Sequence, residues 1–93
     1  MNAHSFMTLP AFPDTPRQRL QAIVAECAHD FITTPAAIMG PSRAQPEAMA
    51  RQEVYLRLRC EGWSLPRIGR ALDRDHTTVI HGIQRAEARR ATA

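Results

Sequence analysis

The apolar residues of this chain recur every three or four positions rather than every second position. Over residues 16–31, 46–61, 64–72 and 76–90 they follow the period of an amphipathic helix. A shorter stretch, residues 34–40, carries a single apolar pair and has room for one or two helical turns. No stretch alternates apolar and polar residues as a half-buried strand would. The pattern therefore predicts an all-α fold, a compact bundle of about five helices.

Local signals mark where these helices begin and end. Thr15, Thr34 and Ser64 each precede a helical stretch and are followed within two positions by a proline, which suits a first helical turn. Asp75 is expected to cap the last helix, and Gly62 to end the third. These signals place four helix starts and one helix end without reference to the apolar pattern.

The chain is expected to form one domain preceded by an arm. Residues 1–14 lack a helical period and hold two prolines, which predicts a flexible arm, and residues 15–93 then form the domain. Nothing near the start has the basic segment and continuous apolar run of a signal peptide. Cys27 and Cys60 both lie in apolar helical patterns and do not make a disulfide framework, so a reduced, cytoplasmic protein without a membrane span is expected.

The positive charge lies in the second half of the chain. All twelve basic residues are arginine, and the net charge is −1 over residues 1–42 but +4 over residues 43–93. Clustered arginines pair well with phosphates, which favours a polyanionic partner. A basic surface that only faces solvent explains the charge equally well, so charge alone leaves both interpretations open.

Two short helices joined by a tight turn, residues 64–72 and 76–90, have the layout of a helix-turn-helix. In that motif the second helix enters the major groove with its N-terminus first. His76, Thr77 and Thr78 lead this helix, directly after Asp75. A threonine hydroxyl can donate to or accept from a base edge, and its methyl group can contact a thymine methyl. Further along one side of the helix, His81 and Arg85 can reach phosphates.

The segment SLPRIGRALDRDHTTVIHGIQRAE makes the interpretation more specific. Its motifs SLPxIG and RDHTTVIH resemble the C-terminal DNA-binding domain of the bacterial replication initiator DnaA. Upstream, SR followed eight residues later by RQ resembles the basic loop of that family and the start of its third helix. The resemblance extends over roughly residues 17–90 and implies a nine-base-pair DNA box as the target.

The resemblance also implies a role for each matching residue. Minor-groove contact is implied for Arg43, and major-groove base contact for Asp75, His76, Thr77 and Thr78. Phosphate contact is implied for Arg51, Gln52, Arg59, Leu65, Pro66 and His81, to which Arg85 is added from its helical position.

The chain departs from the family pattern at the turn and in the basic loop. Asp73 stands where the family usually has glycine, and Arg43 is the only cation of a loop that often carries several. The chain is also about one residue shorter before Ser64 and before Arg74. The single cation suggests weaker binding to the DNA backbone, so the preferred box is expected to differ.

We expect a DNA-reading domain without catalytic activity. The ATPase module of DnaA needs a Gly-rich phosphate loop with a lysine, and this sequence has no lysine. No nucleophile–base pair or metal-ligand set is apparent, so no cofactor, metal or small-molecule substrate is expected. The expected function is sequence-specific binding of double-stranded DNA as a stand-alone transcriptional regulator of phage or prophage-like origin, associated with the nucleoid. Another DNA-bound protein or an RNA polymerase subunit is the candidate protein partner.

Two alternatives stay open at this point. One is a competitor or accessory factor at DnaA-type boxes in replication control. The other is a protein-interaction module that uses the same fold. For single residues, Tyr55 is expected in the core, Trp63 over the helix-turn-helix or at a partner site, and Gly69 and Gly82 where helices pack closely.

Overall fold

The computed structural model describes residues 15–92, so the arm expected over residues 1–14 lies outside the described part of the chain. Five helices make up this part, without a strand: α2 (Pro16–Asp30), α3 (Pro35–Met39), α4 (Gln45–Cys60), α5 (Leu65–Leu72) and α6 (His76–Thr92). The predicted all-α fold is confirmed, and each helix begins and ends within two residues of its predicted bounds. No helix in this part of the chain is both long and apolar enough to cross a bilayer.

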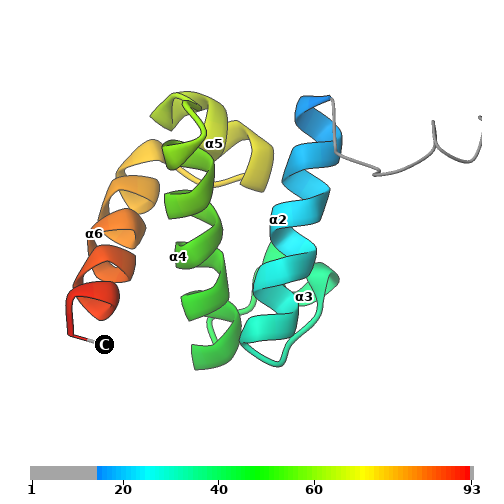
Figure 1. The fold of residues 1–93 in the computed structure, drawn as a ribbon, viewed down its shortest axis with the longest axis vertical. Helices are drawn as coiled ribbons and strands as arrows, with labels where there is room; N and C mark the ends of the chain where they lie inside the picture. The colour runs from blue at the N-terminus through cyan, green and yellow to red at the C-terminus, as the bar shows by residue number, and fades with distance from the viewer. Residues whose placement is uncertain (1–14, 93) are drawn as a thin grey trace, which may run out of the picture.

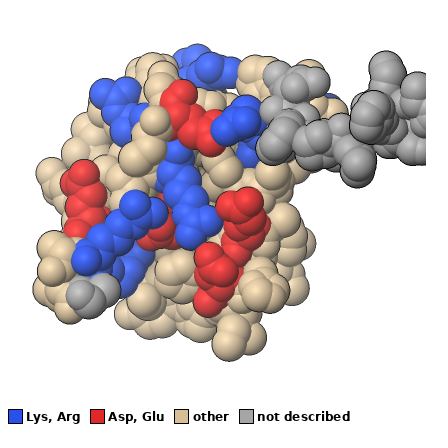
Figure 2. Space-filling view, viewed as in Figure 1, with Lys and Arg blue, Asp and Glu red and all other residues tan. Residues whose placement is uncertain are grey.

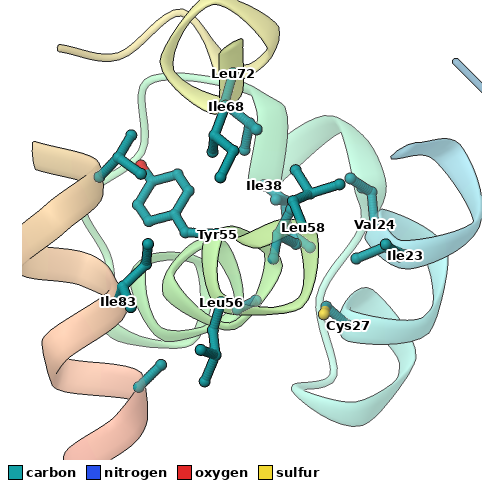
Figure 3. Close-up of a cluster of buried hydrophobic side chains, with 14 of the residues drawn as sticks. Ile23, Val24, Cys27, Ile38, Tyr55, Leu56, Leu58, Ile68, Leu72 and Ile83 are labelled. Carbon is teal, nitrogen blue, oxygen red and sulfur yellow. The ribbon is translucent and has the colours of Figure 1, made fainter. Parts of the chain in front are cut away.

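Helix α4 is the centre of the bundle. It packs against each of the other four helices, with α2 and α6 on opposite sides and α5 across one end (Figure 1). Its inward side chains include Tyr55 and Leu58, which are almost fully buried. Ile38 from α3, and Ile68 and Leu72 from α5, close the core around them (Figure 3). Because α5 and α6 both rest on this core, the helix-turn-helix is held as a rigid unit.

Hydroxyl caps start three of the helices, as predicted. The Thr15 hydroxyl accepts a hydrogen bond from the backbone N–H of Gln18, and the Thr15 backbone N–H donates to Oε1 of the Gln18 side chain, which completes a capping box. Thr34 and Ser64 cap α3 and α5 in the same way, each accepting from the amide three residues later. Helix α4 differs, because Ala44 precedes it and gives no side-chain cap.

Three helices end in the same backbone arrangement, the Schellman motif. In each, a residue with positive φ follows the helix, and the next amide donates to a carbonyl five residues back. Gly62 holds this position after α4 with φ of 97°, as predicted, but Ile32 (53°) holds it after α2 and Asp73 (54°) after α5. The left-handed backbone at Asp73 is a conformation that glycine adopts more readily than aspartate.

The structure corrects two expectations about single residues. The Asp75 carboxylate accepts no amide hydrogen bond within residues 15–92, so it does not cap α6. Its oxygen instead lies 3.7 Å from Nδ1 of His76. Cys60, expected on an apolar helix face, is exposed, because α4 turns it away from the core beside the helix end, whereas Cys27 is fully buried.

Close packing is confirmed at Tyr55, Trp63 and Gly82, whereas Gly69 packs against a turn and not against another helix. Tyr55 and Trp63 belong to the core, with 2% and 8% of their surface exposed. A Cβ on Gly82 would lie 2.5 Å from the Tyr55 ring, which confirms a close contact between α4 and α6. A Cβ on Gly69 would lie 2.5 Å from the Arg74 carbonyl oxygen, so this glycine makes room for the turn backbone rather than for another helix.

Candidate nucleic-acid interface

The first turn of α6 faces solvent. His76, Thr77 and Thr78 are all exposed, whereas Val79 is fully buried. The helix therefore anchors itself through Val79 and the residues that follow on the same side, and it leaves its leading polar side chains without a protein surface over them. A helix-turn-helix needs this geometry if its second helix is to enter a groove.

Beside this exposed turn lies an open hollow of about 590 Å³, which we call the arginine hollow. Helix α4 forms its floor, α6 and the turn before α6 form one side, and the connection from α3 to α4 forms the other. It is lined by Pro41, Arg43, Ala48, Arg51, Gln52, Tyr55, Arg74, Thr78, His81, Gly82 and Arg85. Six of the residues for which a DNA contact was predicted thus meet on one surface, although 42 positions separate the first from the last.

The charge of the arginine hollow is of one sign. Four arginines and a histidine line it, and no acidic residue does. None of these four arginines is in an ion pair within the described residues. A concave surface with uncompensated positive charge attracts a polyanion and raises its local concentration.

On the face shown in Figure 2, by contrast, positive and negative side chains are mixed. There arginine and acidic side chains lie beside one another over α2, α4 and α6. Arg57 pairs with Glu26 and Asp30 of α2 at 3.3 and 3.2 Å and with Glu53 of its own helix at 3.3 Å. Arg90 of α6 also contacts Glu53. Ion pairs therefore compensate charges between α2, α4 and α6, whereas the four arginines of the arginine hollow have no acidic partner in the described residues.

Arg51 is the member of the hollow that differs most from expectation. Its side chain is buried, with 7% of the residue exposed. Nε donates to the Ile38 carbonyl at 2.7 Å, and Nη2 donates to the carbonyls of Ala37 and Gly40 at 3.2 and 3.0 Å. Burial and the nearby charge of Arg74 lower the pKa of Arg51, although a guanidinium stays protonated at neutral pH. Arg51 thus holds α3 and the following connection against α4, and its phosphate contact stays a prediction.

Gln52 is oriented by an arginine of α6. Nη1 of Arg89 donates to Oε1 of Gln52 at 2.6 Å, and Nη2 donates to the Met49 carbonyl at 3.1 Å. Because a guanidinium has only donors, the amide oxygen must face it. The amide nitrogen of Gln52 is then left for an acceptor, which is the polarity that a phosphate contact requires. Arg89 thus orients a side chain of the arginine hollow from near the end of α6.

The other predicted contacts lie apart from the arginine hollow. Pro66, Asp75 and His76 line a second, smaller depression at the helix-turn-helix junction. Thr77 is exposed on α6 and lines neither depression. Arg59 and Leu65 line neither, and Nη1 of Arg59 donates to the Trp63 carbonyl at 2.9 Å. Each of these contacts stays a prediction.

Two arginines near the interface were missed by sequence reasoning. Arg74 lines both depressions, and its guanidinium bonds to backbone carbonyls on either side of the arginine hollow. Arg67 lies at the start of α5 with its guanidinium carbon 4.0 Å from the centre of the Trp63 ring. Arg74 lies inside the RDHTTVIH motif, but its contact with Gly40 depends on the tertiary fold and has no signal in the local sequence.

Comparison with known protein families agrees with this arrangement. The family model described as the bacterial DnaA protein helix-turn-helix matches residues 20–86, which include α3 to α5, most of α2 and the exposed start of α6. No solved structure matches the chain. The family match spans both sides of the arginine hollow and the helix-turn-helix. The chain belongs to the family of bacterial DnaA helix-turn-helix domains, a family that binds double-stranded DNA.

Proposed function

We propose that this protein binds double-stranded DNA sequence-specifically and acts as a transcriptional regulator. The observation that carries the proposal is the position of the arginine hollow directly beside the exposed first turn of α6. A duplex that receives this turn in its major groove brings its phosphates over the hollow, where the arginines lack acidic partners. Phosphate contacts then position the protein and the base contacts specify the sequence.

In the proposed complex each side chain has a separate task. His76, Thr77 and Thr78 reach base edges in the major groove, and Asp75, whose carboxylate is not used as a cap, accepts from a base amino group. Arg43, on the connection between α3 and α4, reaches the adjacent minor groove. Phosphates are bound along the hollow and at the start of α5 by Gln52, His81, Arg85, Arg59 and the backbone around Leu65 and Pro66, with Arg51 at the floor of the hollow.

The proposed activity is binding, without catalysis. The 93 residues hold no lysine and therefore no Walker-type phosphate loop, so we expect no ATP hydrolysis by them. A regulator of this kind works in the cytoplasm at the nucleoid, and the exposed outer faces of the bundle are available to RNA polymerase or to a second DNA-bound protein. We also propose the phage or prophage-like origin named above.

The experiment that tests the proposal is selection of duplexes from a randomised pool by the purified protein. A recurrent sequence motif after several rounds supports the proposal, and a pool that stays random overturns it. Recovery of a DnaA-type nine-base-pair box supports a competitor or accessory factor in replication control, the second function that the family membership favours. Recovery of a different motif supports the regulator.

A further inference from the structure

The connection that carries Arg43 is tied to the helix-turn-helix by a single side chain. Nη2 of Arg74, in the turn before α6, donates to the Gly40 carbonyl at 2.6 Å. Nη1 of the same guanidinium donates to the carbonyls of Leu72 and Asp73 at 2.9 and 3.2 Å. One planar group therefore bridges the end of α5 and the residue that begins the connection from α3 to α4, 34 positions earlier in the chain.

The bridge is reinforced on both sides. The Gly40 carbonyl also accepts from Nη2 of Arg51 at 3.0 Å, so two guanidinium groups converge on one oxygen. On the other side, the Arg74 amide donates to the Gly69 carbonyl at 2.7 Å, and the Arg74 carbonyl oxygen would lie only 2.5 Å from a Cβ on Gly69. The backbone of Arg74 is thus held by α5 while its side chain holds Gly40.

We propose that Arg74 is a positioning residue that sets the distance and angle between the Arg43 connection and the start of α6. The inference rests on the DNA-binding function proposed above. A minor-groove contact by Arg43 and a major-groove contact by α6 must fall on neighbouring stretches of one duplex, so the two elements need a fixed spacing. The Arg74 guanidinium makes three hydrogen bonds, and all three go to backbone carbonyls. Arg74 therefore acts through Gly40 rather than through a base.

The geometry of the guanidinium group explains why arginine is needed here. A guanidinium presents two terminal nitrogens in a fixed plane, so it can bond to Leu72 and Gly40 at once. A lysine keeps the positive charge but has one terminal nitrogen on a flexible stem. Arg74→Lys therefore separates the positioning role of Arg74 from its contribution to the charge of the hollow.

The test uses the duplex that the wild-type protein selects from a randomised pool, together with variants that each carry one substituted base pair. The Arg43 positions are the base pairs at which Arg43→Ala no longer distinguishes the selected base pair from its substitutes. The Thr78 positions are the base pairs at which Thr78→Ala loses the same discrimination. We expect Arg74→Lys to lower discrimination at the Arg43 positions by roughly five- to tenfold and to leave the Thr78 positions unchanged. The salt dependence of binding should stay that of the wild type, because the charge is kept.

Two further variants make the result specific. In an Arg43→Ala background, Arg74→Lys should cause no additional loss at the Arg43 positions, because the contact that it positions is already absent. Arg17→Lys, the same substitution at an exposed position of α2, should behave as the wild type. Circular dichroism shows at which temperatures each variant is folded. Arg74→Gln keeps one terminal nitrogen donor but not the two-nitrogen guanidinium, and it should also lose discrimination at the Arg43 positions alone.

Unchanged discrimination at the Arg43 positions in Arg74→Lys would overturn the inference while leaving the DNA-binding proposal intact. Equal loss at every position would also overturn it, since a general weakening is what loss of a simple phosphate contact or of folding produces. A wild-type protein that selects no duplex would remove the proposed function itself, and the positioning role with it.

Discussion

At the scale of single residues, the start of α6 separates structural from recognition side chains within one turn. Val79 is fully buried and fixes the helix, whereas Thr78 is exposed and borders the arginine hollow. A substitution at Thr78 can therefore change recognition without changing the core.

Thr78→Ala is expected to relax base preference at one position of the selected duplex by about 1–3 kcal/mol, because it removes one hydroxyl and one methyl group from the groove. Affinity for a panel of single-base-pair substitutions, measured by fluorescence anisotropy, checks this. Thr92→Ala is the matched control, since Thr92 lies at the other end of the same helix and bonds only to the carbonyls of Ala88 and Arg89. Equal weakening on all sequences would assign Thr78 a different role.

The two cysteines should react differently with a thiol reagent. Cys27 is fully buried, and burial raises its pKa to about 11, so it stays a neutral thiol at pH 8. Cys60 is exposed. We expect one fast equivalent of label in the native protein at pH 8 and a second on unfolding, with Cys60→Ser abolishing the fast one. Two fast equivalents in the folded protein would contradict the buried position of Cys27.

The raised pKa of Cys27 also has a consequence for stability. A group whose pKa is raised on folding stabilises the native state fully below its unfolded value and loses that effect as the pH rises through the folded value. The contribution of Cys27 should therefore decline from about pH 8.5 upward. Urea unfolding from pH 7 to 10, with Cys27→Ala for comparison, measures this decline.

At the scale of helices, the three Schellman motifs have different residues at their positive-φ position, Ile32, Gly62 and Asp73. Ile32 is β-branched and 91% exposed, so it strains the backbone after α2 and packs against little. Ile32→Gly should raise the free energy of unfolding by about 1 kcal/mol. Gly62→Ala should lower it by about the same amount, because a Cβ at Gly62 meets nothing within 4 Å and only the backbone responds. Urea denaturation of the wild type and both variants measures these changes. An Ile32→Gly protein less stable than the wild type would refute this account.

The contact between α4 and α6 depends on the absence of a side chain at Gly82. Gly82→Ala places a methyl group 2.5 Å from the Tyr55 ring and should cost about 1–3 kcal/mol, more than the roughly 1 kcal/mol that alanine returns as a helix former. In a Tyr55→Leu background the ring is gone, and the same substitution should become neutral or stabilising. Urea denaturation of the four proteins in this cycle measures the coupling, and equal effects in both backgrounds would show that the ring is not the obstacle.

The helices were predictable from the sequence because their signals are local. The 3.6-residue period, the hydroxyl caps at Thr15, Thr34 and Ser64, and the glycine at Gly62 act within one or two turns. The helix ends at Ile32 and Asp73 carry a weaker signal or none, because isoleucine disfavours the left-handed conformation and aspartate adopts it less often than glycine does.

The interface was predictable only in part, for a related reason. The motif in α5 and α6 named the residues of the reading helix, which are neighbours in the chain. The use of Arg51 and Arg74 depends on the Gly40 carbonyl, which is brought to them by tertiary packing across 11 and 34 positions. A pattern along one helix cannot show that an arginine is turned inward toward a carbonyl of another segment.

At the scale of the whole molecule, the bundle separates its charges. Arginine and acidic side chains lie beside one another on the face in Figure 2, and ion pairs join α2, α4 and α6. Four arginines without an acidic partner in the described residues line the arginine hollow beside the start of α6. This separation gives a small protein with a modest net charge of +3 one surface suited to a polyanion.

The most direct test of this account is the salt dependence of binding to the selected duplex. We expect log Kd to rise linearly with log salt concentration, with a slope of about 0.9 per phosphate contact. Arg85→Ala, in the arginine hollow, should lower that slope by about one unit, whereas Arg17→Ala, at an exposed position of α2, should not change it. Absence of duplex binding in dilute buffer, or equal slopes for the wild type and Arg85→Ala, would contradict the placement of DNA over this surface.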